Sequence, residues 1–262
     1  MIFQKIFYYS ILLVNMKFDN DVFDYISGSQ FSNGASIKIA KSNEIIYNRF
    51  QLIESLCANK NIIHLGCVDH LPLISKKIEK NTWLHARLCK VTKRCLGIDI
   101  NIEGINYLKD KLGYNDVIFG DIAYENIGEI HNNFWNFLVM GEILEHVDNP
   151  CFFLQQIREK YKNNIEKLII TVPNAFSWQN FINVFYHREL INTDHRYWFS
   201  PYTLAKILFK AGIQVEEFYF CDSFDRDYRM KFIISHPSII FQKFLFKMYP
   251  ATRLTLLMVA KL

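Results

Sequence analysis

The cysteines of this chain lack the spacing that redox motifs and metal clusters use. None of them belongs to a Cys-x-x-Cys pair, and most lie among apolar residues. Reduced thiols packed inside an intracellular protein show this pattern. We therefore predict neither a disulfide nor a metal site, and we expect a cytoplasmic protein. The six cysteines are Cys57, Cys67, Cys89, Cys95, Cys151 and Cys221.

Long basic runs are also absent. The 30 Lys and Arg residues nearly balance the 26 Asp and Glu residues, which leaves a net charge of +4, and no extended block of consecutive Lys or Arg occurs. Proteins that bind nucleic acid through their charge carry a basic patch or stripe. The sequence therefore predicts a partner other than nucleic acid.

The apolar run at residues 6–14 lacks the features of a membrane span or a cleaved signal. It is too short to cross a bilayer, and no small-residue cleavage site follows it. We interpret it as a strand or helix packed on the domain, or as sequence ahead of a second start at Met16. A membrane-surface anchor is the alternative.

The first predicted turn has too few glycines for a dinucleotide-binding motif. Such a fold needs G-x-G-x-x-G opening into a helix, whereas NIIHLG at 61–66 supplies Gly66 alone. This absence argues against a pyrophosphate cofactor, and so against a nicotinamide-dependent oxidoreductase. A glycine at this turn still allows close approach of the backbone to a nucleotide-like ligand, because a side chain there would collide with it.

Apolar segments of strand length alternate with segments of helical periodicity along most of the chain. This alternation indicates α/β architecture with a doubly wound, mostly parallel sheet and right-handed crossovers. The last strand leaves no room for a following helix, so we expect it to complete a seven-stranded sheet as an antiparallel member. The predicted strands span 61–66, 95–99, 116–120, 134–140, 167–172, 213–221 and 255–262.

The helical segments and the domain limits follow from the same periodicity. A chain of 262 residues that is 50% hydrophobic can form one large domain. We assign an N-terminal extension to 1–40, loosely structured over 19–40, and a domain to 41–262 with insertions at about 174–199 and 222–250. We expect an inserted loop over 67–81. Helices are predicted over 42–58 with Ser42 as cap, 83–91, 103–113, 150–161 and 201–211.

Polar residues stand where three of the predicted strands end, at the edge where open α/β sheets bind ligands. Asp99 ends the second strand and is placed to accept hydrogen bonds from ribose hydroxyls. Asp121 and Ile122 follow the third strand, where a carboxylate could pair with the adenine amine while the apolar side chain packs on the ring. The fourth strand runs into Gly141 and Glu142.

These segments together resemble the class I S-adenosylmethionine-dependent methyltransferases. The resemblance covers about 61–262 and is to the small-molecule branch, which includes ubiquinone-type and sugar or polysaccharide-pathway enzymes. Its most specific parts are GEILEHVDNP at 141–150 and HRYWFSPYTL at 195–204. The family implies S-adenosylmethionine as cofactor and a small molecule as acceptor. A saccharide or a lipid-linked substrate would be such an acceptor.

The resemblance implies the following cofactor contacts. Gly66 and Cys67 match the turn beside the methionine part of the cofactor, and Gly141 and Glu142 match positions that line it. The sequence departs from the family at His64, which replaces an acid, and at Val68 and His70, which replace later glycines. Asp99 matches the ribose-binding acid with Ile100 beside it, and Asp121 and Ile122 match the adenine contacts.

Two histidines are candidates for the base that removes the acceptor proton. His146 follows the turn after the fourth strand, with a structural helix-start histidine as its alternative. His195 lies where family members place substrate contacts, and Asp194 beside it would hold its tautomer. Glu145 is interpreted as part of the architecture of the following helix, and His64 as a buried, hydrogen-bonded group.

Two further segments have open interpretations. The aromatic-rich segment 176–198 is either a lid that excludes water or a packing segment. Residues 236–249 form an apolar stripe with lysines outside it, which indicates a helix packed on its own domain or one that contacts a membrane surface.

The leading hypothesis is a methyltransferase that modifies a hydroxyl of a sugar or glycan-pathway intermediate. A non-catalytic binding or scaffold protein that keeps the fold is the first alternative, and the altered turn at 64–70 supports it. The oxidoreductase is the second alternative.

Overall fold

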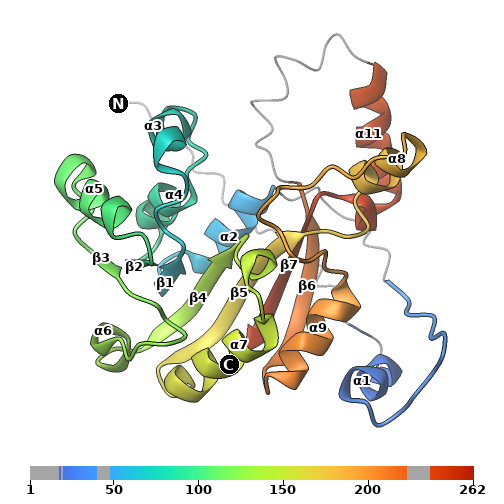
Figure 1. Cartoon of the computed structure of the whole chain (residues 1–262), viewed down its shortest axis with the longest axis horizontal. Helices are drawn as coiled ribbons and strands as arrows, with labels where there is room; N and C mark the ends of the chain where they lie inside the picture. The colour runs from blue at the N-terminus through green and yellow to red at the C-terminus, as the bar shows by residue number, and fades with distance from the viewer. Residues whose placement is uncertain (1–17, 19, 40–47, 223–236) are drawn as a thin grey trace, which may run out of the picture.

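The computed structural model describes residues 18, 20–39, 48–222 and 237–262. The predicted apolar run at 6–14, the second start at Met16 and the Ser42 cap lie outside these residues. Figure 1 shows a central sheet with helices against both of its faces. Among the described helices, none is both long and apolar enough to cross a membrane.

The sheet has seven strands in the order β3-β2-β1-β4-β5-β7-β6. All neighbouring pairs are parallel except those that β7 makes with β5 and β6. The predicted doubly wound sheet with an antiparallel last strand is therefore confirmed. The strands are β1 (Asn61–Leu65), β2 (Arg94–Asp99), β3 (Val117–Phe119), β4 (Trp135–Gly141), β5 (Ile165–Pro173), β6 (Gln214–Cys221) and β7 (Thr255–Lys261).

Alternate residues of the strands enter two separate apolar layers. On β1, Ile63 belongs to the layer beneath α1, α6, α7 and α9, and Ile62 belongs to the layer beneath α2 and α4. A strand that is buried on both faces needs apolar residues at successive positions, which explains the continuous apolar runs in the sequence. A third cluster joins α3, α4 and α5.

The helices that cover the sheet have these bounds: α1 (Asn20–Ser27), α2 (Arg49–Cys57), α3 (Leu71–Glu79), α4 (Leu84–Val91), α5 (Ile102–Leu112), α6 (Gly128–His131), α7 (Pro150–Tyr161), α8 (Trp178–Phe185), α9 (Pro201–Lys210) and α11 (Pro237–Met248). Short 3₁₀ turns are η1 (Leu144–His146) and η2 (Pro250–Thr252). The helix expected from Ser42 is described from Arg49, with the side chain of Asn48 as its N-cap.

Two segments predicted to be irregular contain helices. Within 19–40, α1 buries Val22 and Ile26 in the main core, beside Phe18, whose ring lies 4.9 Å from that of Phe218. The sequence did not reveal this helix, because Val22 and Ile26 are a single apolar i, i+4 pair among Ser, Asn and Gly residues. The predicted loop at 67–81 contains α3, of which only Ile74 is buried. One buried residue in nine gives too little periodicity to reveal a helix.

We predict that Ser200→Ala lowers the free energy of unfolding by about 1 kcal/mol. Ser200 caps α9 in a capping box, in which its side chain accepts from the Thr203 N–H and the Thr203 side chain accepts from the Ser200 N–H. Urea denaturation followed by circular dichroism measures the change. Ser200→Asp, which can still accept that hydrogen bond, is the matched control and should remain near wild type; equal losses in both variants would contradict the capping role.

Candidate functional site

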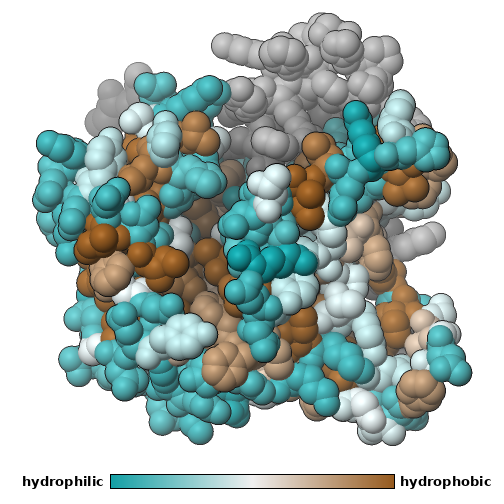
Figure 2. All heavy atoms as spheres, in the orientation of Figure 1, coloured by the Kyte–Doolittle hydropathy of each residue, from teal (hydrophilic) through white to brown (hydrophobic). Residues whose placement is uncertain are grey.

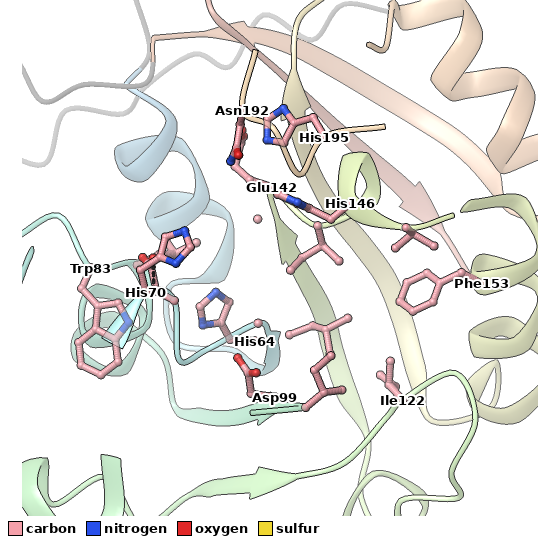
Figure 3. A pocket seen from close by; sticks show the side chains of 18 of the residues that line it. His64, His70, Trp83, Asp99, Ile122, Glu142, His146, Phe153, Asn192 and His195 are labelled. Carbon is pink, nitrogen blue, oxygen red and sulfur yellow. Dashed lines mark hydrogen bonds between the residues drawn. The ribbon is translucent and has the colours of Figure 1, made fainter. Parts of the chain in front are cut away.

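A cavity of about 1140 Å³ opens at the carboxyl ends of β1, β2 and β4. The strand order reverses at β1, whose neighbours are β2 and β4, and a crevice forms at such a switch point. Figure 2 shows a hollow with apolar residues around it near the centre of this face. Figure 3 shows His64 and Asp99 toward one end and Glu142, His146, Asn192 and His195 toward the other.

The turn after β1 brings backbone to the cavity wall. Gly66 has a φ of +73°, and a Cβ at this position would lie 2.5 Å from Cδ1 of Ile143. The next residues keep the turn tight, because Asp69 has a φ of 59° and forms an ion pair of 2.6 Å with Lys77 of α3. Gly66, Asp69 and His70 all line the cavity.

Cys67 faces away from this cavity. The thiol lies against β2, because a Cβ added to Gly97 would come within 2.8 Å of Sγ of Cys67. The Cys67 carbonyl accepts a hydrogen bond of 3.0 Å from the indole N–H of Trp83. Burial raises the pKa of the Cys67 thiol, so the thiol stays neutral. Any cofactor contact by Cys67 is therefore limited to its backbone, and that contact remains a prediction.

The predicted ribose acid connects two elements of the site. Asp99 accepts a hydrogen bond of 2.9 Å from the Val68 N–H and another of 2.9 Å from the Asn101 N–H. Each carboxylate oxygen has a second lone pair, so both can accept a further bond from a ligand. Ile100 beside it is 69% exposed and lines the cavity.

The predicted adenine contacts lie on the wall formed after β3. Oδ1 of Asp121 accepts hydrogen bonds of 2.9 and 3.3 Å from the Ala123 and Tyr124 N–H groups, which fixes the carboxylate. Ile122 is buried and lines the cavity with Phe153. The structure thus brings together a fixed carboxylate and an apolar wall, and their contact with adenine remains a prediction.

The turn after β4 carries unusual backbone. Glu142 has a φ of 59°, a conformation that non-glycine residues seldom adopt, and its N–H donates to the Thr171 carbonyl. Oε1 of Glu142 lies 2.8 Å from Nη1 of Arg49, without the angle of a hydrogen bond. Arg49 was not predicted as a site residue. Gly141 lines the cavity and lies close to Leu84.

Glu145 lies in the 3₁₀ turn η1 and is buried, which the sequence did not predict. Its side chain is fully buried, and neither carboxylate oxygen has a hydrogen-bond partner. Burial, with a smaller contribution from the charge of Glu142, raises the pKa of Glu145 to about 9. A helix-building role does not explain a buried, unpaired carboxyl. The spacing Glu-x-x-Glu-His at 142–146 is the signal that could have identified it.

The two candidate bases lie next to one another, but their acid partner differs from the expectation. Asp194 was expected to orient His195; instead its Oδ2 lies 2.8 Å from Nδ1 of His146. The rings of His146 and His195 are edge to face, with centroids 4.6 Å apart. Nε2 of His195 lies 4.0 Å from Oε1 of Glu145, and its Nδ1 has no partner.

Backbone and side-chain bonds hold the 194–197 segment over this turn. The Arg196 N–H donates to the Glu145 carbonyl at 2.7 Å, and its Nη1 donates to the His146 carbonyl at 2.6 Å. Arg196 also pairs with Asp148, and the hydroxyl of Tyr197 donates to the Asp148 carbonyl at 2.6 Å. These bonds bring His195 to the cavity from a distant part of the sequence.

Most aromatic residues of the predicted lid do not face the cavity. From the 176–198 segment, Asn192 and His195 line it, whereas Phe176, Phe181 and Val184 line a second, shallower groove with Leu245 and Tyr249. Phe181 is 58% exposed. Closure of these aromatic side chains over the cavity remains a prediction.

Glu145, His146 and His195 offer one ligand atom each within 4.8 Å of one another. One carboxylate and two imidazoles form a donor set that suits Zn²⁺, Mn²⁺ or Fe²⁺. The unpartnered atoms of Glu145 and His195 fit a cation, because a cation would satisfy groups that the protein leaves without partners. The sequence predicted no metal site here.

Comparisons with known proteins address the fold. No family model and no curated protein matches the sequence. Solved structures do match. A small RNA methyltransferase, HEN1, matches with a TM-score of 0.50 and 12% identity, over 86% of this chain and 27% of that one. The present chain thus spans about a quarter of the length of that protein.

Two other matches cover most of both chains. They are a SAM-dependent methyltransferase from Archaeoglobus fulgidus (TM-score 0.43, 15% identity, 81% of this chain and 94% of that one) and magnesium protoporphyrin IX methyltransferase from Synechocystis PCC 6803 with bound SAH (TM-score 0.48, 10% identity, 81% and 78%). The fold is that of class I methyltransferases. At these identities the likeness extends to the fold alone.

We predict that Mn²⁺, which thiol ligands disfavour, raises the melting temperature of the wild-type protein much more than that of Glu145→Gln. The cation would pair the buried carboxylate, whereas the amide removes the anionic ligand. Without metal, Glu145→Gln should be at least as stable as wild type, because a buried, unpaired acid is replaced by a neutral group of the same size. Differential scanning fluorimetry measures both effects.

The matched control is Glu129→Gln, on α6 at the surface and outside the cavity. It should retain the full metal-induced shift. An equal shift in wild type and Glu145→Gln, at metal concentrations that saturate the effect, would contradict this site.

Proposed function

We propose that this chain is an S-adenosylmethionine-dependent methyltransferase whose acceptor is a hydroxyl of a small molecule, a sugar or a glycan-pathway intermediate. One observation carries the proposal: a single cavity combines two different parts. Along one part lie carboxylates held by hydrogen bonds and backbone that forms the cavity wall, and at the other lies a cluster of histidines and acids. Its volume of about 1140 Å³ slightly exceeds the ~300–1000 Å³ usual for one ligand. It therefore has room for cofactor and acceptor together.

The residues of the first part fit the proposed cofactor. The free lone pairs of Asp99 suit ribose hydroxyls, and Asp121 suits the exocyclic amine of adenine, with Ile122 against the ring. Gly66 and Gly141 have no side chains, so the backbone there leaves space for the amino-acid portion of S-adenosylmethionine. His64, which replaces the family acid, is 3% exposed and hydrogen-bonds to His85, so it shapes the floor and carries no negative charge.

The second part suits the removal of a proton from the acceptor. S-adenosylmethionine, when bound, supplies a methyl group on a positively charged sulfur. The chain must align the acceptor oxygen with that methyl, which is worth about 7–11 kcal/mol when orientation is good. An imidazole nitrogen of the protein would take the hydroxyl proton that the acceptor loses when it is methylated.

Two arrangements of the histidines support this proton transfer. Burial, together with the neighbouring His146, lowers the pKa of His195, so the imidazole is neutral and can accept a proton at neutral pH. Asp194 accepts from Nδ1 of His146 and so leaves Nε2 of that ring as the basic atom. A cation held by Glu145, His146 and His195 would instead lower the pKa of the acceptor hydroxyl itself.

A sugar acceptor is favoured by the mixed character of this part of the cavity. Asn192, Glu142 and the two histidines offer hydrogen-bond partners for several hydroxyls, while Phe152 and Phe153 supply apolar wall. An RNA hydroxyl is the second candidate, because one structural neighbour is a small RNA methyltransferase. Transfer of labelled methyl to RNA oligonucleotides but not to nucleotide sugars would favour the second acceptor.

We predict that S-adenosylmethionine and S-adenosylhomocysteine bind to the wild-type chain and that Asp99→Asn weakens this binding by about 10–100-fold. The amide loses the charge-assisted hydrogen bonds to ribose, worth about 1.5–3 kcal/mol, yet keeps the size of the side chain. Isothermal titration calorimetry measures the affinities, and Asp110→Asn on the surface of α5 is the control.

Calorimetry also separates the alternative functions. Absence of binding at high protein concentration would refute the enzyme proposal and favour the scaffold. Binding of a nicotinamide dinucleotide in place of S-adenosylmethionine would favour the oxidoreductase.

We predict that His195→Gln reduces turnover by about 100- to 10,000-fold, the usual contribution of a general base, while the affinity for S-adenosylhomocysteine stays near wild type. Labelled-methyl transfer measures turnover once an acceptor is known. His187→Gln, from the same segment but outside the cavity, is the matched control. Retained turnover in His195→Gln, with loss in His146→Gln, would assign the base to His146.

A further inference from the structure

Two histidines and two cysteines gather beneath the floor of the cavity. His64 comes from β1, His85 and Cys89 come from α4, and Cys95 comes from β2. None of them is a predicted site residue. We propose that these four side chains bind one soft divalent metal ion, with Zn²⁺ as the best match, at a site distinct from that of Glu145, His146 and His195.

Three of the four side chains have the spacing of a tetrahedral site around Nδ1 of His85. Nδ1 of His64 lies 3.2 Å from Nδ1 of His85, and Sγ of Cys95 lies 3.7 Å from the same atom. With metal–nitrogen bonds of ~2.0 Å and metal–sulfur bonds of ~2.3 Å, tetrahedral ligands are separated by about 3.3–3.8 Å. His85, Cys89 and Cys95 each offer a ligand atom within 4.8 Å of one another.

The local structure places these side chains around the imidazole of His85, with His64 and Cys95 at its Nδ1 and Cys89 at its Nε2, so Cys89 must turn toward Nδ1 for all four to share one ion. His85 and Cys89 are four residues apart on α4, so they lie on the same face of the helix. Cys89 Sγ lies 3.7 Å from Nε2 of His85. Beneath the imidazole stands Gly97, where a Cβ would come within 2.9 Å of Cε1 of His85. A glycine at this strand position lets the imidazole rest directly on the sheet.

The chemistry of the cluster selects a class of metal. Two thiols and two imidazoles are the ligand set of structural zinc sites, whereas Mg²⁺ and Ca²⁺ prefer oxygen. The thiolate is the form of cysteine that binds metal, so binding of the ion releases the thiol protons. Cys89 is exposed and gives an ion access from solvent.

The surroundings would hold such an ion firmly. The rings of Trp83 and Tyr114 lie 5.5 Å from that of His85, measured between centroids, and form an apolar shell on the buried side. An ion here would connect β1, α4 and β2 under the cavity floor, to which His64 itself contributes. Its role is therefore structural, and its detection does not depend on methyl transfer.

The test uses full-length protein that has been reduced and treated with a chelator. Titration with Co²⁺ should produce thiolate-to-cobalt charge-transfer absorption that saturates at one ion per chain, and one equivalent of Zn²⁺ should abolish it. Cys89→Ser and Cys95→Ser should each reduce the band to about half, because one of two thiolates is lost. The double variant should show no band.

Two control variants distinguish this cluster from the remaining thiols and from the carboxylate–imidazole cluster of the cavity. Cys57→Ser removes a buried thiol of the same apolar cluster as Cys95 and should leave the band unchanged. Glu145→Gln should also leave it unchanged, because a carboxylate–imidazole site produces no thiolate band. Circular dichroism verifies that each variant is folded.

Three results would overturn the proposal. The first is the absence of a charge-transfer band in the wild-type protein, which needs no variant to interpret. The second is a band that persists in the double cysteine variant. The third is a reduced protein that takes up no metal and converts in air to a Cys89–Cys95 disulfide, detected by mass spectrometry.

Discussion

The position of β1 between β2 and β4 is the constraint on which the site depends. Both neighbours run parallel to β1, so all three strands end at the same edge, while the connections that follow them diverge to opposite faces of the sheet. The chain therefore opens a crevice where Gly66, Asp99 and Gly141 meet. The hydrogen bond from the Val68 N–H to Asp99 connects the ends of β1 and β2 and fixes the width of this crevice.

The turn after β4 combines a strained backbone with a buried carboxyl that has no hydrogen-bond partner. Glu142 keeps an unfavourable φ because its N–H bonds to β5 and its carboxylate faces Arg49. Glu145, three residues later, is buried without a partner. Leaving an ionisable group in this condition costs several kcal/mol when it is charged. Strain and unsatisfied polarity thus occur together at one turn, beside the cavity.

Most of the fold was predictable because periodicity and cap residues encode it locally. The strands and the helices α5, α7 and α9 follow from apolar spacing, and Ser200 and Gly113 mark helix ends by their own conformational preferences. The positions of Gly66, Asp99 and Gly141 at the cavity were predictable for a related reason, since strand ends determine them. The helices α1 and α3 were missed because each buries too few residues to leave a pattern.

The end of the cavity that carries His146 and His195 was predictable only in part, because long-range contacts define it. Spacing in the sequence could identify His146 and His195, but not that Asp194 would pair with His146. Arg49 and Arg196 act through partners about 50 or more residues away. The burial of Glu145 depends on the 194–197 segment above it, and a single sequence contains no local record of such packing.

The two ends of the cavity differ in how they are built, and this difference bears on specificity. The floor consists of strand ends locked by backbone hydrogen bonds and by the His64–His85 pair. The opposite end comes from the segment that connects β5 and α9, and hydrogen bonds from Arg196 and Tyr197 hold this segment in place. Changes in that segment can alter the shape of this end of the cavity without disturbing the sheet. The sheet therefore fixes one end of the cavity, whereas the 174–199 segment shapes the other.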